Sequence, residues 1–176
     1  FFTRLVLALD RAGLDQRVVI RSNPARAQVL GEGGIKPVEL PFGGLMDWRT
    51  PRALKREIDN YRPDVVLTWM NRATQMCPKG NFVHVGRLGG YYDLKYYQNC
   101  DHLIGNTQDI RDYLVGHGWE GNKAHYLPNF VSQEKADPVL RRELYTPDGA
   151  PLVLGLGRLH KNKAFDMLLE AASRVP

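Results

Sequence analysis

The sequence lacks several patterns that would each point to a particular class of protein. Its two cysteines, Cys77 and Cys100, are too few for a disulfide framework and fit a reducing, cytoplasmic setting. Neither the cysteines nor the five histidines show the spacing of metal ligands, so we expect no metal cofactor. No apolar run reaches the ~20 residues that a membrane-spanning helix needs. These absences argue against a disulfide-rich scaffold, a zinc module and a membrane-embedded protein.

Two common nucleotide-binding motifs are absent as well. A P-loop requires Gly-Lys followed by Ser or Thr, and this tripeptide does not occur. The dinucleotide fingerprint requires a third glycine at the helix start, whereas Gly155-x-Gly157 is followed by Leu159 and His160. The sequence therefore predicts neither a P-loop nucleotidase nor an enzyme that uses NAD or FAD.

One segment near the end of the chain nevertheless has the pattern of a strand, a loop and a helix. Residues 152–156 form a short apolar run between Pro151 and Gly157, which is typical of a buried parallel strand. A helix is predicted to begin at residue 163 or 164, with Asn162 as its N-cap. The N-terminus of a helix attracts anions through its unpaired N–H groups.

Positive charge gathers in the same loop. Arg158, Lys161 and Lys163 add three cations beside the predicted helix start, and the arginine can contact two phosphate oxygens at once. Gly157 leaves room for the backbone to approach a ligand. The segment therefore predicts a diphosphate-binding loop formed by Gly157, Arg158, Lys161 and Lys163.

Strands and helices alternate along the rest of the chain. We expect strands at 16–21, 36–40, 64–68, 82–87, 102–106 and 124–127, helices at 2–12, 24–30, 51–61, 91–98 and 109–115, and a helix or loop at 70–76. Helical crossovers between successive strands are what a parallel sheet requires. The pattern therefore predicts an α/β fold with a Rossmann-like, doubly wound parallel sheet. Because such a domain begins with a strand and this chain begins in a helix, we expect the first strand to be missing.

The composition changes after residue 130. Residues 131–150 are polar and contain Pro138, Pro147 and the turn pair Asp148-Gly149, with one short helical stretch at 139–145. This is typical of a linker. We therefore expect an N-terminal Rossmann-like domain at 1–130, a hinge or linker at 131–150, and the start of a second Rossmann-like domain at 151–176.

The pattern Gly-Arg-Leu-His-x-Asn-Lys-x-Phe-Asp-x-Leu-Leu-Glu-Ala at 157–171 resembles the diphosphate-binding segment of the retaining glycosyltransferases of the GT-B fold, family 4. Pro-Asn-Phe-Val at 128–131 resembles that family's exit from its first domain. One departure is Ala164, where the family usually has glycine. The resemblance implies that the first domain binds the acceptor and the second the donor. The family's donor-binding glutamates would lie beyond Pro176, so we do not expect the chain alone to be a complete catalyst.

The resemblance also implies a reaction. A hexosyl-type sugar would pass from a nucleotide-diphosphate sugar to a glycan or lipid-linked acceptor with retention of anomeric configuration. Arg158 and Lys163 would be catalytic because they stabilise the departing diphosphate. The chain has no Asp-x-Asp, with which glycosyltransferases of the other major fold hold a metal. The segments at 91–95 and 105–107 resemble enzymes of bacterial cell-envelope or lipopolysaccharide synthesis.

Candidate acceptor residues follow the carboxyl ends of the predicted strands, where ligands bind in open α/β sheets. They are Asn71, Arg72, Arg87, Tyr91, Lys95 and Asn106. Aromatic rings suit the apolar faces of sugars, and Arg87 or Lys95 would suit a phosphorylated or acidic acceptor. Helix capping explains Asn71 and Asn106 nearly as well. We expect His84, in mid-strand, to be a buried histidine bonded to the backbone.

The net charge of +5 leaves alternatives for partners and function. A basic protein can bind nucleic acid, but the arginines are scattered and no nucleic-acid module is visible, so we expect no such partner. The helix face formed by Arg49, Arg52 and Arg56 is either a solvated surface or a peripheral contact with lipid headgroups on the inner face of the cell membrane. Two other functions share this architecture: a GT-B epimerase or phosphorylase, and a non-catalytic nucleotide- or phosphoglycan-binding Rossmann module.

Overall fold

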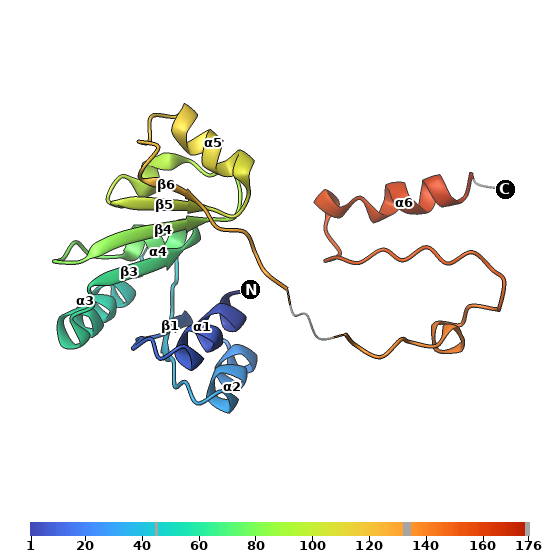
Figure 1. Ribbon diagram of the computed structural model, residues 1–176, viewed down its shortest axis with the longest axis horizontal. Coiled ribbons are helices and arrows are strands. Elements are labelled where there is room, and N and C mark those ends of the chain that lie inside the picture. Colours follow the sequence, from blue (N-terminus) through green and yellow to red (C-terminus); the bar gives the residue numbers. More distant parts are fainter. Residues whose placement is uncertain (45, 132–134, 175–176) are drawn as a thin grey trace. The chain divides into compact units, whose positions relative to one another are not determined.

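The computed structural model describes residues 1–44, 46–131 and 135–174. The chain divides into two compact units, Phe1–Val131 and Ser132–Pro176 (Figure 1). Across the described residues, no helix is both long and apolar enough to cross a membrane.

The first unit alternates helices and strands, as the sequence predicts. Its elements are α1 (Phe2–Arg11), β1 (Val19–Arg21), α2 (Pro24–Glu32), β2 (Val38–Leu40), α3 (Arg49–Tyr61), β3 (Val65–Trp69), α4 (Met70–Met76), β4 (Val83–Leu88), the 3₁₀ helix η1 (Leu94–Tyr97), β5 (His102–Gly105), α5 (Gln108–Gly116) and β6 (Ala124–Tyr126). All strand pairs are parallel, so the predicted Rossmann-like α/β fold is confirmed. The helix predicted at 91–98 is only the short η1, because aromatic residues dominate it and form helices poorly.

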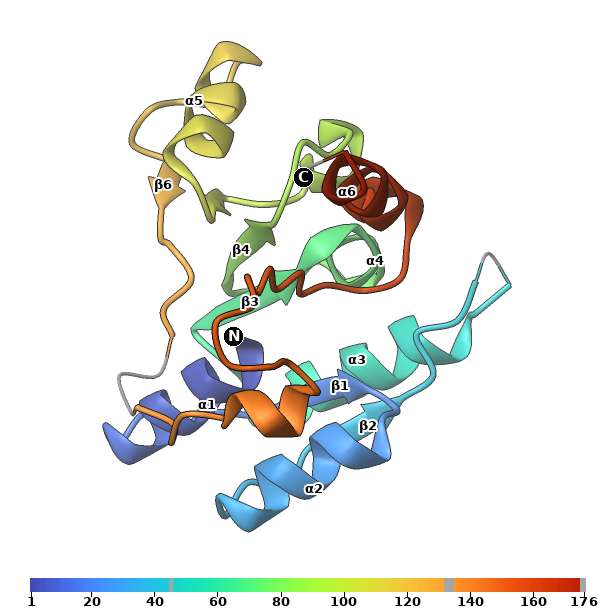
Figure 2. The ribbon, with the colours of Figure 1, turned by 90° about the vertical axis from the view of Figure 1, so that its right-hand side faces the viewer.

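The strands form two sheets. β1 pairs with β2, and the second sheet has the order β3-β4-β5-β6. In the four-stranded sheet, Trp69 lies opposite Arg87, Arg87 opposite Ile104, and Ile104 opposite His125. Among the described residues no strand ladder joins the two sheets, and Figure 2 shows β1 and β2 side by side and apart from β3. The carboxyl ends of β3 to β6 therefore meet at one edge, where the candidate acceptor residues follow.

Each sheet has its own hydrophobic core. The two-stranded sheet packs Val18 and Ile20 against Val6 of α1 and Leu30 of α2. The four-stranded sheet is covered by η1 and α5, which bury Leu88, Tyr97, Leu103, Ile110 and Leu114. A Cβ at Gly86 would lie 2.9 Å from Tyr97 Cδ1, so glycine is what lets η1 pack closely on β4. This packing fixes the loop between β4 and β5 over the sheet.

The second unit contains the 3₁₀ helices η2 (Arg141–Leu144) and η3 (Lys161–Lys163) and the helix α6 (Phe165–Ala172). The strand predicted at 152–156 is wrong, since residues 135–174 form no strand. A buried strand needs neighbours that accept its hydrogen bonds, and here the apolar side chains are open to solvent, with Leu156 83% exposed. The helix is present but begins at Phe165, and Asn162 does not cap it because Ala164 occupies that position.

Candidate functional site

The basic loop of the second unit packs against α6 through its glycines. A Cβ at Gly155 would lie 3.0 Å from Leu168 Cδ2, and one at Gly157 would lie 3.3 Å from Phe165 Cζ and 3.5 Å from Lys163 Cγ. Gly157 therefore lies beside the Lys163 side chain. The predicted diphosphate contacts Arg158, Lys161 and Lys163 are all exposed, so their charges are open to a ligand.

The turn between this loop and α6 has an unusual backbone. Ala164 adopts the left-handed conformation, with φ 49° and ψ 40°, and the N–H of Leu168 donates to its carbonyl at 3.1 Å. Among the described residues no side chain caps α6, so the first-turn N–H groups can receive an anion. Asp166 lies in the first turn and opposes an anion there. Because L-residues adopt this conformation at a cost, the turn suits the glycine that the resembled family usually places at this position.

In the first unit, Arg87 lies buried at the carboxyl end of β4. Its guanidinium carbon is 4.6 Å from the ring centre of Phe1 and 5.0 Å from that of Trp69. Nη2 donates to the carbonyl of Leu127 at 2.9 Å and to Asn129 Oδ1 at 3.1 Å. Burial lowers the pKa of Arg87, and Nε has no hydrogen-bond partner in the part of the chain described. The side chain thus ties the end of β4 to the segment that follows β6.

Asn71 and Arg72, which follow β3, both contact other parts of the unit. Asn71 Oδ1 accepts a hydrogen bond from the Tyr97 hydroxyl at 2.7 Å, and Tyr97 is fully buried. Arg72 is exposed and donates from Nη1 to the Phe42 carbonyl at 3.0 Å. The capping role considered for Asn71 is wrong, because no side chain caps α4. Asn71 instead joins α4 to η1.

Tyr91 and Lys95 lie in the loop after β4. The Tyr91 ring is 63% exposed and stands edge-on to Tyr113 with ring centres 5.3 Å apart, while its hydroxyl donates to Asp109 Oδ2. Lys95 forms an ion pair with Asp93 at 2.6 Å, and this interaction raises the pKa of Lys95. The lysine therefore stays charged and has a carboxylate partner within its own connection.

Asn106 follows β5 and is half-buried. Thr107, rather than Asn106, caps α5, since its Oγ1 accepts from the N–H of Ile110 at 3.1 Å. The Oδ1 atom of Asn106 is buried and has no hydrogen-bond partner within residues 1–44, 46–131 and 135–174. Its Nδ2 lies 3.9 Å from the Cβ that a side chain at Gly89 would carry. Asn106 is thus a polar group beside the Gly89 loop whose Oδ1 accepts no hydrogen bond from the described residues.

His84 is buried, as predicted. The ring bonds the Asn99 carbonyl through Nδ1 at 3.2 Å and the Thr68 hydroxyl through Nε2 at 2.9 Å. Burial lowers its pKa, so the neutral ring is favoured. His84 therefore has a structural explanation and is not part of the candidate site.

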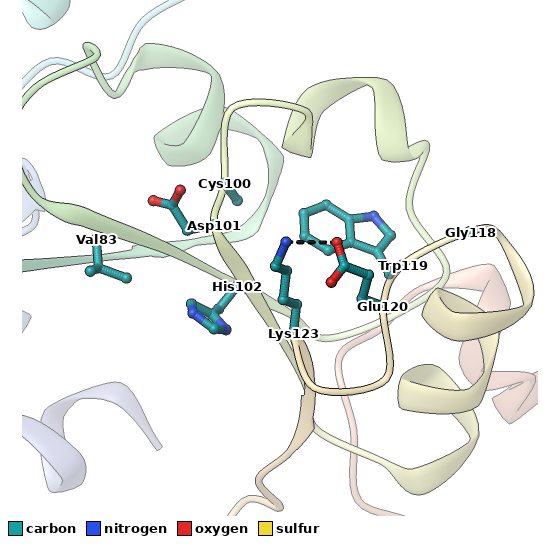
Figure 3. Close-up of a pocket in the computed structure, with 8 residues that line it drawn as sticks. All are labelled: Val83, Cys100, Asp101, His102, Gly118, Trp119, Glu120 and Lys123. Carbon is teal, nitrogen blue, oxygen red and sulfur yellow. Dashed lines mark hydrogen bonds and ion pairs between the residues drawn. The ribbon is translucent and has the colours of Figure 1, made fainter.

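The structure also has a hollow of about 480 Å³ at the opposite edge of the four-stranded sheet (Figure 3). Val83 and His102 line it at the starts of β4 and β5, and Lys123 forms an ion pair with Glu120 at 2.7 Å across it. Ligands in open α/β sheets bind at the carboxyl ends of strands. The hollow therefore lies at the wrong edge for the predicted acceptor site. In the described residues no group of three His, Cys, Asp or Glu side chains could hold a metal ion.

Several contacts at the site were not predicted. Asp109 bonds Tyr91, Asp93 pairs with Lys95, and Asn129 accepts from Arg87. The partners are between 2 and 42 positions apart in the sequence. Only Asp93 and Lys95 are near enough for the sequence alone to suggest their pairing. The other two depend on which loops the parallel sheet brings together.

The fold and these sites define a Rossmann-like α/β protein with a basic loop at the start of a helix. Residues 1–135 match the model of Glycosyltransferase Family 4. The chain belongs to this family, as the sequence suggested, although the matched residues do not include the segment at 157–171.

Two similar curated proteins come from Rhizobium meliloti (strain 1021). Lipopolysaccharide core biosynthesis glycosyltransferase LpsE is 34% identical over 181 residues, which cover 100% of this chain and 52% of the relative. Lipopolysaccharide core biosynthesis glycosyltransferase LpsD is 33% identical over 185 residues, covering 99% and 52%. The chain therefore spans about half the length of these two relatives.

A third relative is an alpha-galactosylglucosyldiacylglycerol synthase of Streptococcus pneumoniae (strain ATCC BAA-255 / R6). It is 30% identical over 92 residues, which cover 48% of this chain and 25% of the relative. No solved structure matches the chain significantly.

Proposed function

We propose that the chain is part of a glycosyltransferase of lipopolysaccharide or glycolipid synthesis. It transfers a sugar from a nucleotide-diphosphate sugar to a glycan or lipid-linked acceptor. The observation that carries this proposal is the family match over residues 1–135. The names of the relatives support it, since two are lipopolysaccharide core biosynthesis glycosyltransferases and one is an alpha-galactosylglucosyldiacylglycerol synthase.

The donor diphosphate binds at the loop formed by Gly157, Arg158, Lys161 and Lys163. During transfer the bond from the anomeric carbon to the diphosphate oxygen breaks, and a bond from the same carbon to the acceptor oxygen forms. The acceptor proton passes to the departing diphosphate. Exposed cations and the uncapped α6 terminus support this role, because both stabilise the negative charge that grows on the leaving group.

The acceptor binds at the carboxyl edge of the four-stranded sheet. Tyr91, Lys95 and Asn106 lie on the loops that follow β4 and β5, and Arg72 is exposed after β3. Direct acceptor contacts by Asn71 and Arg87 stay predictions. Their bonds to Tyr97 and to Leu127 favour a positioning role, in which they hold the loops that bear the other residues.

Retention of configuration and independence from metal ions are further parts of the proposal. The full-length protein should be incubated with UDP-, GDP- and ADP-sugars and simple glycan acceptors, with and without EDTA. We expect a glycan product of unchanged anomeric configuration, detected by mass spectrometry and NMR, in amounts that EDTA does not lower. Interconversion of the donor sugar without transfer would instead indicate an epimerase, and release of a sugar phosphate from glycan and phosphate would indicate a phosphorylase.

Peripheral contact with the cytoplasmic face of a membrane completes the proposal. Arg49, Arg52 and Arg56 are exposed along α3, and the Arg52 guanidinium lies 4.8 Å from the ring centre of Trp48, which is 64% exposed. Cations beside an exposed tryptophan suit anionic headgroups. Flotation with phosphatidylglycerol vesicles should recover the full-length protein, and R52E/R56E should lower recovery. R4E/R11E, which removes the same charge from exposed positions of α1, is the control.

A further inference from the structure

Three polar or aromatic side chains that follow neighbouring strands are Tyr91, Asn106 and Asp109, which we call the platform. Tyr91 lies in the loop after β4, Asn106 directly follows β5, and Asp109 is in the first turn of α5. β4 and β5 are neighbours in the sheet, so both loops are at its carboxyl edge.

The Tyr91 ring is held firmly although it is largely uncovered. Its hydroxyl is bonded to Asp109, and its ring stands edge-on to Tyr113. Tyr113 is itself fixed, because its hydroxyl donates to the Tyr92 carbonyl at 3.0 Å. Tyr91 is 63% exposed as a residue, and a ring held at two points loses little freedom when an apolar surface stacks on it.

Two polar groups with spare hydrogen-bonding capacity accompany this ring. The Asp109 carboxylate accepts from Tyr91 and has lone pairs left over. The Asn106 amide, beside Gly89, has a buried Oδ1 without a partner among the described residues. A buried acceptor without a donor is costly, so a small shift or flip of the amide toward a ligand hydroxyl would be favourable.

Three cations that are close to the platform residues in the sequence already have partners. Lys95 is paired with Asp93 at 2.6 Å, Arg111 with Asp112 at 3.0 Å, and the Arg87 guanidinium is buried and bonded to Leu127. A phosphate or carboxylate on the ligand would therefore be repelled by Asp109 and would compete with Asp93 and Asp112 for the nearby cations. This favours hydroxyl groups and disfavours the phosphorylated or acidic acceptor that Arg87 and Lys95 suggested from the sequence.

We infer that Tyr91, Asn106 and Asp109 bind the acceptor through an uncharged, hydroxyl-rich sugar. The ring of Tyr91 stacks on the C–H face of the sugar, Asp109 accepts from its hydroxyls, and Asn106 bonds a further hydroxyl. The inference rests on the proposed function, because it identifies the chemistry of the acceptor at the same edge.

Saturation-transfer NMR on the full-length protein tests this inference. The probes are the methyl α-glycosides of glucose, galactose and mannose, with glucose 6-phosphate and glucuronic acid as charged counterparts. We expect transfer to the ring protons of at least one methyl glycoside, and weaker transfer to the charged sugars. Y91A should lower the affinity roughly three- to tenfold. Y91F, which keeps the ring and frees Asp109, should retain binding, and D109N and N106A should weaken it.

The control is Y145A, because Tyr145 is 96% exposed and belongs to the other unit. Circular dichroism should show that each variant folds. The inference is overturned if no methyl glycoside binds, if the charged sugars bind more tightly, or if Y91A and D109N behave like Y145A. Binding of nucleoside diphosphates gives a separate readout: if it persists while the glycosides fail to bind, only this inference falls, and if it is absent the proposed function falls.

Discussion

Arg87 donates from Nη2 to the carbonyl of Leu127 at 2.9 Å, which ties the end of β4 to the segment by which the chain leaves its first unit. The same nitrogen reaches Asn129 Oδ1, and the planar guanidinium lies over Phe1 and Trp69. One buried arginine thus joins three stretches of chain. Since no carboxylate is bonded to it among the described residues, hydrogen bonds and aromatic stacking must stabilise its charge.

We predict that R87K lowers the free energy of unfolding of the full-length protein by about 1–3 kcal/mol. Lysine keeps the charge but cannot stack between two rings and bond two acceptors at once. Urea denaturation followed by tryptophan fluorescence measures the change. R56K, at an exposed position of α3, should change the value by no more than about 0.5 kcal/mol. Equal changes in the free energy of unfolding for R87K and R56K would contradict the role of Arg87 in joining β4 to the segment after β6.

Asp47 should make the stability of the first unit depend on acid pH. The Thr50 hydroxyl, followed by the backbone N–H groups of Thr50 and Gly43, lowers the pKa of Asp47 from 3.8 to about 2. A lowered pKa means that the unfolded chain binds the proton more readily. The stabilisation is therefore complete above about pH 5 and is lost as the pH falls from about 4 to 2.

The measurement compares urea midpoints of the wild type and D47N between pH 2 and pH 7. We expect a constant advantage of the wild type at neutral pH that shrinks below pH 4. D59N removes an exposed carboxylate from α3 and controls for the loss of one negative charge. A wild-type advantage that stays unchanged down to pH 2 would rule out the proposed hydrogen bonds of the carboxylate.

Replacement of Ala164 by glycine should cost less stability than replacement of an alanine inside the helix. Its backbone is left-handed, with φ 49°, where an L-residue is disfavoured by about 1–2 kcal/mol and glycine is not. We expect A164G to leave α6 as stable as before or more stable, by up to about 1 kcal/mol. A171G, inside α6, should destabilise the helix by about 0.5–1 kcal/mol. Hydrogen exchange of the α6 amides distinguishes them, and equal loss of protection would refute the assigned conformation.

Much of the fold could be predicted because it depends on local patterns. The apolar runs at 64–68 and 82–87 predict β3 and β4 to within a residue or two. The strand at 152–156 could not be judged locally, because the same apolar run forms a strand only where neighbouring strands accept its hydrogen bonds. The alternation of elements likewise does not show that the strands form two sheets.

The candidate site shows the same limit. The basic loop can be recognised from a short stretch of sequence, because its exposed cations lie within six residues, from Arg158 to Lys163. Burial of Arg87 and the partnership of Tyr91 with Asp109 arise from loops that are distant in sequence and meet only in the folded unit. The positions of Arg87 and Tyr91 in the sequence therefore predict that both lie at the carboxyl edge of the sheet. They do not predict that Arg87 is buried and that Tyr91 is exposed to solvent.

The central claim is that the cations before α6 bind the diphosphate of the donor. Calorimetric titration of the full-length protein with UDP, GDP and ADP tests it most directly, with R158A/K163A as the variant and R142A, which removes one cation from an exposed position of the same unit, as a control. The account predicts that R158A/K163A weakens the best-bound diphosphate at least tenfold, a loss of about 1.4 kcal/mol, while R142A binds like the wild type. Unchanged affinity in R158A/K163A would contradict it.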